Sequence, residues 1–489
     1  MKIILLYPMW TSEYGLIAHF AKKGATWPPL NLAYLAAMAE LAWHQVKIID
    51  AQCENMPRER QVRETEDFKP DIIGITSTTP FHHLALALAK ELKQRLQKIP
   101  ILIGGHHITV LKEKAFDPCF DYGFIGEADK SWPLFLERYR QGLDIAEIKG
   151  ILYRKEGEIL FTGEPDVMDD IDSVPLPARH LLKNDQYRIG TLRGTKNFTT
   201  IMTTRGCPFK CIFCTTKVFG KKLKARTPRL VVDEIQSVIR DFKISHFLFL
   251  DDTLTLSRKN ILEICKLIID EKINVTFEGS TRANLIDEEL IYKMAAAGLI
   301  RLSFGLETVD EDIRRIMRKE VPLESYVQAN KLTNKYGIET LNSCMIGLPG
   351  ETKDTVRKTL LFLRKSKEIK QANISIAVPY PGTELYEMAK RGDYRLHLET
   401  EDFSMFRRYN SATMFVGDLS PKDLIKLQND AFASIYIVPR RWMPVLRKSG
   451  LLGLLLTFVR LFKSLASGKA EFLTTRQLEA GSAKGEGET

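Results

Sequence analysis

Three of the seven cysteines lie within eight residues, at Cys207, Cys211 and Cys214. Their C-x3-C-x2-C spacing supplies three thiolates from one segment, which also contains Gly206 and Pro208. A structural zinc site usually takes four protein ligands, and a 4Fe–4S cluster usually takes four cysteines. Three thiolates leave one iron with an open position, where a substrate can coordinate. The spacing therefore favours a 4Fe–4S cluster; a zinc site completed by a distant His and inert packing cysteines are the alternatives.

The other four cysteines are scattered along the chain, at Cys53, Cys119, Cys265 and Cys344. A disulfide framework is typical of small secreted chains, whereas this chain has 489 residues and an odd number of cysteines. The apolar start, residues 1–8, is too short for a signal peptide and lacks a small-residue cleavage site, so we interpret it as a first strand. These features predict a cytoplasmic protein.

The bulk composition is that of a folded chain with more than one domain. With 44% apolar and 27% charged residues it fits neither a fibrous nor a disordered protein. Its length predicts roughly two to four domains. The net charge is +10, and residues 431–470 hold seven basic residues and no acidic one. Because this segment carries most of the excess, the charge does not require a nucleic-acid partner.

The positioning elements begin with an alternation of strands and helices over residues 1–140. Apolar runs predict strands at Lys2–Tyr7, Val46–Asp50, Asp71–Thr76, Pro100–Gly104 and Tyr122–Ile125. Amphipathic stretches predict helices at Leu30–Trp43, Arg58–Phe68, Phe81–Gln97, Thr109–Lys114 and Ser131–Gln141. Five strands with helices between them predict a doubly wound parallel sheet of the flavodoxin-like kind.

Small and polar residues follow three of these strands. Such sheets bind ligands in the crevice at the carboxyl ends of the strands. Ser77 and Thr78 follow the third strand, Gly104 and Gly105 the fourth, and Glu127 the fifth. Glycines allow a backbone to approach a bulky cofactor closely. These residues are therefore candidates for a cofactor site at this edge.

A connector over residues 141–198 leads into a second alternation over residues 199–410. The connector contains a predicted hairpin, Gly150–Arg154 with Glu158–Thr162, and a proline-rich crossing at residues 174–180. Predicted strands then follow at Thr199–Thr203, His246–Leu250, Asn274–Glu278, Arg301–Phe304, Glu339–Met345 and Ala372–Pro379. Predicted helices between them include Leu230–Asp241, Lys259–Asp270, Glu288–Ala297 and Leu323–Tyr336. Six such units predict a partial (β/α)6 barrel with chemistry at the carboxyl ends of its strands.

The last region, residues 411–489, is predicted to be a helical extension with a disordered tail. Its stretch Trp442–Leu465 is basic and amphipathic, and its nine-residue apolar run cannot cross a bilayer, which needs about 20 residues. Arg and Lys beside a Leu, Phe and Val face suit a helix lying on an anionic membrane, which would favour a lipid substrate. The alternative is a helix that packs on the barrel and exposes its basic face.

The cysteine segment resembles the cluster loop of the radical S-adenosylmethionine (SAM) superfamily, C-x3-C-x-aromatic-C after the first barrel strand, with Phe213 as the aromatic residue. The resemblance continues at the later strand ends, in the segments 251–252, 278–282, 305–308, 347–352 and 379–383. With the sheet domain in front, the order resembles the cobalamin-binding subclass over about residues 1–410. That subclass includes anaerobic Mg-protoporphyrin monomethyl ester cyclases and hopanoid and bacteriochlorophyll methylases.

The resemblance implies that Cys207, Cys211 and Cys214 hold the cluster and that its open iron chelates the amino and carboxylate groups of SAM. One electron then cleaves a carbon–sulfur bond and leaves methionine and a 5′-deoxyadenosyl radical, which abstracts hydrogen from an unactivated carbon. Phe213 is expected near the adenine, and three strand-end residues are expected to hold the polar groups of SAM, namely Ser280, Arg282 and Glu307. Alternatively, Glu307 caps or pairs within the barrel, Arg282 is a structural ion-pair partner, and residues 350–352 are only a turn.

The same resemblance assigns cobalamin to the front domain, with candidate contacts at Ser77, Thr78, Gly104, Gly105 and Glu127. The chain departs from many cobalamin domains because it lacks the Asp-x-His-x-x-Gly motif whose His ligates cobalt. We therefore expect no protein His on the lower face of cobalt. A cobalt ligand at His106 or His107, and a domain that binds no cofactor, are the alternatives.

The predicted function is methylation of an unactivated carbon of a small molecule, a lipid or a tetrapyrrole, with a reducing electron donor and no nucleic acid. The first alternative is a cobalamin-dependent radical cyclisation or rearrangement without methyl transfer. Alternatives of another class are a cobalamin-binding sensor and an electron-transfer protein. The predicted location is cytoplasmic, with peripheral contact at the inner membrane face through residues 442–465.

Overall fold

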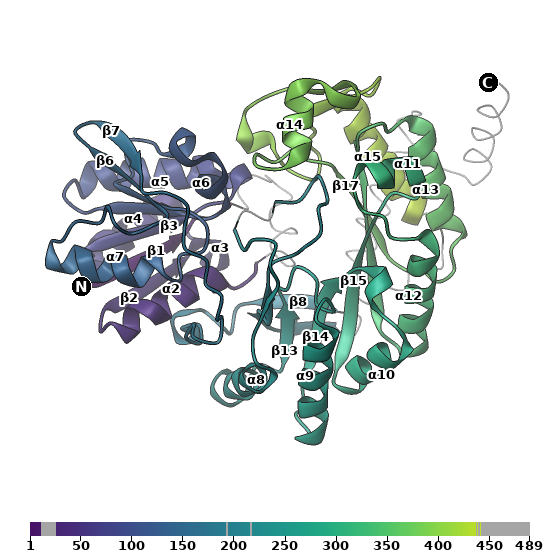
Figure 1. Cartoon of the computed structure of the whole chain (residues 1–489), viewed down its shortest axis with the longest axis horizontal. Helices are drawn as coiled ribbons and strands as arrows, with labels where there is room; N and C mark the ends of the chain where they lie inside the picture. The colour runs from purple at the N-terminus through teal and green to yellow at the C-terminus, as the bar shows by residue number, and fades with distance from the viewer. Residues whose placement is uncertain (11–25, 192–193, 216–217, 437, 439–440, 442–489) are drawn as a thin grey trace. The chain divides into compact units, whose positions relative to one another are not determined.

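The computed structural model (Figure 1) describes residues 1–10, 26–191, 194–215, 218–436, 438 and 441. It divides the chain into two compact units. The first unit comprises Met1–Ile189, Asn197–Pro208 and Thr215–Ser245. The second unit comprises Gly190–Lys196, Phe209–Cys214 and His246–Thr489. The predicted basic stretch Trp442–Leu465 and the tail after it lie outside the described residues.

The first unit is built on a sheet with the strand order β2-β1-β3-β4-β5-β6-β7. The strands are β1 (Lys2–Tyr7), β2 (Gln45–Asp50), β3 (Ile72–Thr76), β4 (Ile101–Gly104), β5 (Tyr122–Phe124), β6 (Ile151–Lys155) and β7 (Glu158–Phe161). The first five are parallel, and all five lie where the apolar runs predicted strands. Every residue of β3 is buried because helices cover both faces of a parallel sheet.

The helices of this sheet follow the predicted alternation. They are α2 (Leu30–Leu41), α3 (Ala51–Glu54), α4 (Arg58–Phe68), α5 (His82–Arg95), α6 (His106–Leu111) and α7 (Ser131–Gln141). Figure 1 shows α4 and α5 on one side of the sheet and α2 and α7 on the other. In α5 the residues at i, i+3, i+4 and i+7 from Ala85 are buried, which places one apolar face of the helix against the sheet.

The hairpin that we expected in the connector extends the first sheet. Strand β6 pairs antiparallel with β5, and β7 pairs antiparallel with β6. The remaining elements of this stretch are β8 (Arg188–Thr191), β9 (Gly194–Asn197), β10 (Thr199–Ile201), β11 (Thr204–Arg205), β12 (Lys224–Ala225) and α8 (Pro228–Phe242). Between β11 and β12 runs the segment with the three cysteines.

The second unit contains five parallel strands that pair in chain order. They are β13 (His246–Phe249), β14 (Thr276–Thr281), β15 (Leu299–Glu307), β16 (Glu339–Ile346) and β17 (Ala372–Ile376). The helices are α9 (Arg258–Asp270), α10 (Glu288–Ala296), α11 (Glu311–Ile316), α12 (Leu323–Lys335), α13 (Lys353–Lys365), α14 (Glu384–Arg391) and α15 (Pro421–Tyr436). A two-stranded sheet of β18 (Leu396–Leu398) and β19 (Met414–Val416) follows α14. Together with β10, these strands confirm all six strand positions predicted for this region.

Buried charges occupy the amino-terminal half of the second unit's sheet. The Glu278 carboxylate is paired with Arg301, and it lies 2.9 Å from Nε2 of His246. Burial lowers the pKa of His246 to about 4. Glu278 therefore belongs to the interior of the sheet, although it opens the strand-end segment 278–282.

The chain is an α/β protein with parallel sheets, as its pattern predicts. Within the described residues, no helix combines the length and the apolar character that a membrane crossing needs.

Candidate functional site

The cysteine loop begins and ends at the short antiparallel pair of β11 and β12, which we call the neck of the loop. Strands β11 and β12 form an antiparallel pair in which Arg205 lies opposite Lys224. Gly206 follows with φ 91°, and a Cβ at this position would overlap the carbonyl oxygen of Lys222. Only glycine fits such a conformation and such a close approach without strain. Gly206 before Cys207 is therefore required by the turn that starts the loop.

Cys207 belongs to the first unit, and Cys211 and Cys214 belong to the second unit. The Cys207 amide donates to the Gly220 carbonyl at 3.4 Å, and the side chain of Cys207 is half-buried. All seven cysteines lie in the described part of the chain, and none of them forms a disulfide.

The Cys211–Cys214 turn is fixed by backbone hydrogen bonds inside the second unit. The Cys214 amide donates to the Cys211 carbonyl at 3.1 Å and closes the turn. Between them, the Ile212 amide donates to the Met317 carbonyl at 3.2 Å, and the Ile212 carbonyl accepts from the Leu385 amide at 2.9 Å. The turn is thus attached to the segment after α11 and to the start of α14. The buried side chain of Ile212 adds an apolar anchor.

A cation lies beside the Cys211 sulfur. Arg282, which directly follows β14, places Nη1 3.9 Å from Sγ of Cys211. Its guanidinium also lies 3.7 Å from the ring centroid of Phe209. A guanidinium stacked on an aromatic ring is held in place, and its positive charge stabilises negative charge on a neighbouring sulfur. Arg282 can therefore support either a thiolate ligand or an anionic group bound next to it.

Glu307, at the end of β15, forms an ion pair with Lys319. The distance from Lys319 Nζ to Glu307 Oε1 is 2.6 Å; Glu307 is buried and the side chain of Lys319 is 12% exposed. Glu307 has φ 61°, and the register with β16 shifts between Gly305 and Glu307. Burial alone would lower the pKa of Lys319, but the Glu307 carboxylate opposes this and the pKa is raised. The pairing expected as the alternative for Glu307 is present, and the partner is Lys319.

Lys319 also connects this ion pair to the cysteine turn. Its ammonium lies 5.6 Å from the ring centroid of Phe213, the aromatic residue between the second and third cysteines. The second unit thus brings together Phe213, Arg282 and Glu307 at one edge of the sheet. Ser280 is exposed on β14 at the same carboxyl-terminal edge, in register with Ser303 of β15.

Two residues that contact the site, Phe209 and Lys319, were not predicted from the sequence. Phe209 stands inside the cysteine segment, where an aromatic residue was a visible signal. Lys319 carried no such signal because it follows a short helix far along the chain from the cysteines, and only the fold brings it to Glu307 and Phe213.

The segment 347–352 forms a closed turn after β16. Glu351 is buried and accepts hydrogen bonds from the amides of Gly347 and Leu348, the latter at 3.2 Å. Burial raises the pKa of Glu351 to about 8. Thr352 then caps α13 by accepting from the Thr355 amide at 3.3 Å. Residues 350–352 therefore do form the turn into the next helix that we considered as an alternative.

The carboxyl-terminal edge of the first sheet combines small residues with close backbone contacts. The Ser77 amide donates to the Gly104 carbonyl at 3.0 Å, so β3 and β4 remain paired at this edge. Gly105 has φ 105°, and a Cβ there would overlap the carbonyl oxygen of Ser77. A Cβ on Gly104 would meet nothing within 4 Å. Thr78 is exposed beside them.

Two histidines line this edge. Ser77 Oγ lies 3.1 Å from His82 Nδ1, and the rings of His82 and His107 are 4.2 Å apart between centroids. Burial lowers the pKa of His82 to about 4 and that of His107 to about 3. Both are therefore neutral at physiological pH. His106, in contrast, is exposed.

Glu127 follows β5 but its carboxylate faces protein cations. It is paired with Lys224, and its Oε2 lies 3.7 Å from Nη1 of Arg205. Burial raises the pKa of Glu127, and Lys224 opposes that rise. The predicted cobalamin contact of this residue stays a prediction, while its side chain has these two partners.

The residues present fit the cluster by donor chemistry and cobalamin by the space at the sheet edge. In the described part of the chain, no His, Cys, Asp or Glu side chains form a group of three or more with the geometry to hold a metal ion. The three thiols within eight residues, with Arg282 beside Cys211, are the groups that suit a cluster. The case for cobalamin depends on the open space at Gly104 on the sheet edge.

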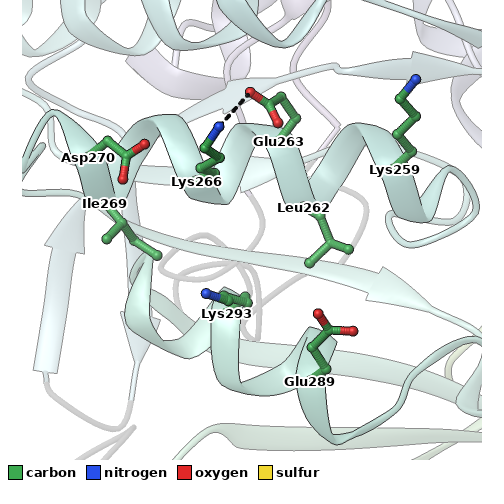
Figure 2. A pocket seen from close by; sticks show the side chains of 8 residues that line it. All are labelled: Lys259, Leu262, Glu263, Lys266, Ile269, Asp270, Glu289 and Lys293. Atoms are coloured by element: carbon green, nitrogen blue, oxygen red, sulfur yellow. Dashed lines mark ion pairs between the residues drawn. The ribbon is translucent and has the colours of Figure 1, made fainter.

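A surface groove of about 320 Å³ lies elsewhere, between α9 and α10 (Figure 2). Figure 2 shows Lys266 and Glu263 on α9 forming an ion pair, at 3.9 Å, and Lys293 and Glu289 on α10. Its other lining residues are Lys259, Leu262, Ile269 and Asp270. The groove contains none of the predicted site residues, and its mixed charges select no particular ligand.

Two family models match this chain. The Radical SAM superfamily matches residues 201–363, and the B12 binding domain matches residues 18–135. The first match includes the three cysteines together with Arg282, Glu307 and Lys319. The second includes Ser77, Gly104, Gly105 and Glu127.

Two relatives and one solved structure are similar to this chain over most of its length. An uncharacterized methyltransferase of Pyrococcus horikoshii is 30% identical over 445 residues, which are 90% of this chain and 93% of the relative. The anaerobic magnesium-protoporphyrin IX monomethyl ester cyclase of Rubrivivax gelatinosus is 28% identical over 428 residues, 84% of this chain and 73% of the relative. The fold is similar to that of the radical S-adenosylmethionine methyltransferase TsrM from Kitasatospora setae, solved with cobalamin and a [4Fe-4S] cluster bound. That structure has a TM-score of 0.72 at 17% identity and covers 95% of this chain and 99% of its own.

Proposed function

Because this chain belongs to the radical SAM superfamily and carries a B12 binding domain ahead of its radical SAM domain, we propose that it is a cobalamin-dependent radical SAM methyltransferase. It cleaves SAM reductively at a 4Fe–4S cluster and methylates an unactivated carbon of a small molecule. The relative named as a methyltransferase covers nearly the whole chain, which supports methyl transfer.

The observation that carries this proposal is the surroundings of Cys211. The Cys211–Cys214 turn lies beside Arg282, and its Phe213 lies near the Glu307–Lys319 pair, at the carboxyl-terminal edge of a parallel sheet. SAM has a carboxylate, an ammonium and a sulfonium group, so a site for it needs both signs of charge close to the cluster. The second unit supplies both signs within one edge.

Each residue has a defined task in this proposal. Cys207, Cys211 and Cys214 would hold the cluster, which would supply the electron for cleavage of a carbon–sulfur bond of SAM. Arg282 orients the carboxylate of SAM and Phe213 borders the adenine. Ser280 forms a hydrogen bond with a polar group of SAM, and the Glu307 carboxylate accepts one, with Lys319 fixing the position of that carboxylate.

In this proposal the chain has two domains, a connector between them and a C-terminal region. Residues 1–140 are a flavodoxin-like cobalamin domain, and the order β2-β1-β3-β4-β5 supports this assignment. Ser77, Thr78, Gly104, Gly105 and Glu127 border the cofactor at its strand ends. A connector over 141–198 precedes a partial (β/α)6 barrel over 199–410, followed by the C-terminal region 411–489.

The substrate class remains a lipid or a tetrapyrrole, and the reaction needs a reducing electron donor. The similarity to a magnesium-protoporphyrin ester cyclase keeps radical cyclisation as the second candidate function. The basic stretch 442–465 remains a proposed contact with an anionic membrane.

The test uses the full chain, purified without oxygen and reconstituted with iron and sulfide. With SAM and dithionite we expect iron and sulfide in a 4:4 ratio per chain and formation of 5′-deoxyadenosine. With cobalamin and SAM labelled at the methyl group, candidate lipid and tetrapyrrole extracts should yield a product that carries the label. A product without the label would support cyclisation instead, and absence of both iron and 5′-deoxyadenosine would refute the proposal.

A further inference from the structure

Four buried charges surround the neck of the cysteine loop. Arg205 and Lys224, opposite each other on β11 and β12, face Glu127 and Asp129 from the segment between β5 and α7. Arg205 Nη1 lies 2.6 Å from Asp129 Oδ2 and 3.7 Å from Glu127 Oε2, and Lys224 is paired with Glu127. All four residues belong to the first unit. Two positive and two negative groups thus form one balanced network.

The network is shielded from water. The exposed fractions of the four side chains lie between 1% and 8%. The Arg205 guanidinium also lies 5.7 Å from the ring centroid of Tyr34 on α2 and 5.5 Å from that of Phe219 in the loop. A buried charge that loses its partner is strongly unfavourable, so the four groups keep one another in place. An exposed surface pair could not fix the backbone to the same degree.

Two members of this network, Arg205 and Lys224, stand at the two ends of the cysteine loop. The sequence between Arg205 and Lys224 contains Gly206, Cys207 and the rest of the cluster loop. Only Gly206 separates Arg205 from Cys207, and its backbone packs so closely on the Lys222 carbonyl that a side chain has no room. Holding Arg205 therefore holds the first cysteine of the loop.

We propose that Glu127 and Asp129, which the front domain presents beyond β5, are positioning residues for the cluster loop. They act through Arg205 and Lys224 and touch neither SAM nor the cluster. The carboxylate of Glu127 thus holds the neck of the loop through Lys224 and Arg205, while its backbone borders the predicted cobalamin edge. This inference rests on the proposed function only for the cluster; the placement of Cys207 can be measured without it.

The first experiment measures how fast each cysteine of the metal-free full chain reacts with iodoacetamide, by mass spectrometry of its peptides. In E127Q and D129N we expect Cys207 to react several-fold faster than in the unmodified chain. The buried Cys265 and Cys344 should keep their low rates and report that the fold is intact. The matched control is D169N, because Asp169 makes an exposed pair with Lys222 of the same loop, 2.7 Å apart. This control should leave the rate at Cys207 unchanged.

A second readout follows the reconstituted cluster by electron paramagnetic resonance in the reduced state, with and without SAM. E127Q and D129N should bind less iron or show altered g-values and a smaller spectral change on adding SAM. R205K, which keeps the charge but loses the forked contact, should lie between them and the unmodified chain. D169N should give the unmodified spectrum.

Either of two results would overturn the proposal. One is an unchanged Cys207 rate and an unchanged spectrum in E127Q and D129N. The other is equal acceleration at Cys207 and Cys344 in E127Q, D129N and R205K alike, which would make the network a general stabiliser of the fold. If the unmodified chain assembles no cluster, the proposed function fails, while the Cys207 rates still decide this inference.

Discussion

The carboxyl-terminal edges of the two parallel sheets differ in what they offer a ligand. The edge of the first sheet consists of small residues, with Gly104 beside open space and Gly105 packed against Ser77. The edge of the second unit's sheet offers side chains, with Arg282 beside a cysteine and Glu307 paired with Lys319. A backbone edge suits a large flat group that must approach closely, whereas charged side chains suit a small ionic molecule. The difference agrees with the proposal that places a corrin ring at the first sheet and SAM at the second.

The buried carboxylates at the two edges also have different partners. Glu127 of the first unit has the partner cations Lys224 and Arg205, whereas Glu351 of the second unit accepts from backbone amides. Burial raises the pKa of both groups, but for Glu351 it reaches about 8. Glu351 is the more deeply buried of the two, and the raised pKa of this carboxyl can be tested by pH.

The largest expected effect is at the second edge, in Cys211→Ser. A serine hydroxyl does not replace a thiolate ligand of iron, so the cluster should be lost and 5′-deoxyadenosine should fall below detection. Iron and sulfide analysis after reconstitution measures the first effect and chromatography the second. Cobalamin binding, followed by its visible spectrum, should persist because the first edge is unchanged. Full iron content in this variant would exclude Cys211 as a ligand.

Next in size is Arg282→Met, which removes the cation beside Cys211 and keeps an apolar side chain against Phe209. Loss of one preorganised charged donor typically costs about 10²–10³ in rate, and we expect a decrease of that order in 5′-deoxyadenosine formation. The matched control is Arg258→Met, since Arg258 makes exposed pairs with Asp287 and Glu289. A rate for Arg282→Met within twofold of this control would reduce Arg282 to a structural residue.

At the first edge, Gly104→Ala places a methyl group where nothing lies within 4 Å. The fold should tolerate it, but a closely bound corrin should not, and overpacking by one methyl group predicts about tenfold weaker cobalamin binding. Gly105→Ala provides the comparison, because its φ of 105° and its contact with Ser77 should lower the melting temperature as well. Equal cobalamin affinity in Gly104→Ala and the unmodified chain would place the cofactor elsewhere.

A smaller effect should appear in the pH dependence of stability at Glu351. The folded chain keeps this carboxyl protonated up to about pH 8, whereas the unfolded carboxyl loses its proton near 4.5. Between these values the folded state binds more protons, so this group makes the free energy of unfolding fall as the pH rises. Glu351→Gln removes the titration, and its melting temperature relative to the unmodified chain should rise from pH 5 to pH 8. A constant difference across this range would contradict the raised pKa.

The smallest effect is expected in the groove between α9 and α10. Lys266→Ala removes a pair of 3.9 Å between exposed side chains, which contributes roughly 0–1 kcal/mol. Cluster content, 5′-deoxyadenosine formation and cobalamin binding should all stay within twofold of the unmodified chain. A larger change in any of them would make this groove part of a site, beyond the two sheet edges.

The sequence by itself determined the elements and named the residues of the proposed cluster site. Apolar runs and amphipathic stretches are local patterns, and they placed every parallel strand of both regions to within a few residues. The spacing of Cys207, Cys211 and Cys214 is also local, because one loop has to supply all three thiolates. The hairpin after residue 150 was visible too, although its pairing with β5 was not.

Only the tertiary structure decided which charges meet. Lys319 reaches Phe213, and Arg205 reaches Asp129, across long separations in sequence, and Lys319 also pairs with Glu307. A charged residue carries no mark of its partner in the sequence, since the partner is selected by how strands and loops pack. The sequence could therefore name Glu127 and Glu307 as candidates for ligand binding, and the fold showed that each carboxylate already has a protein cation beside it.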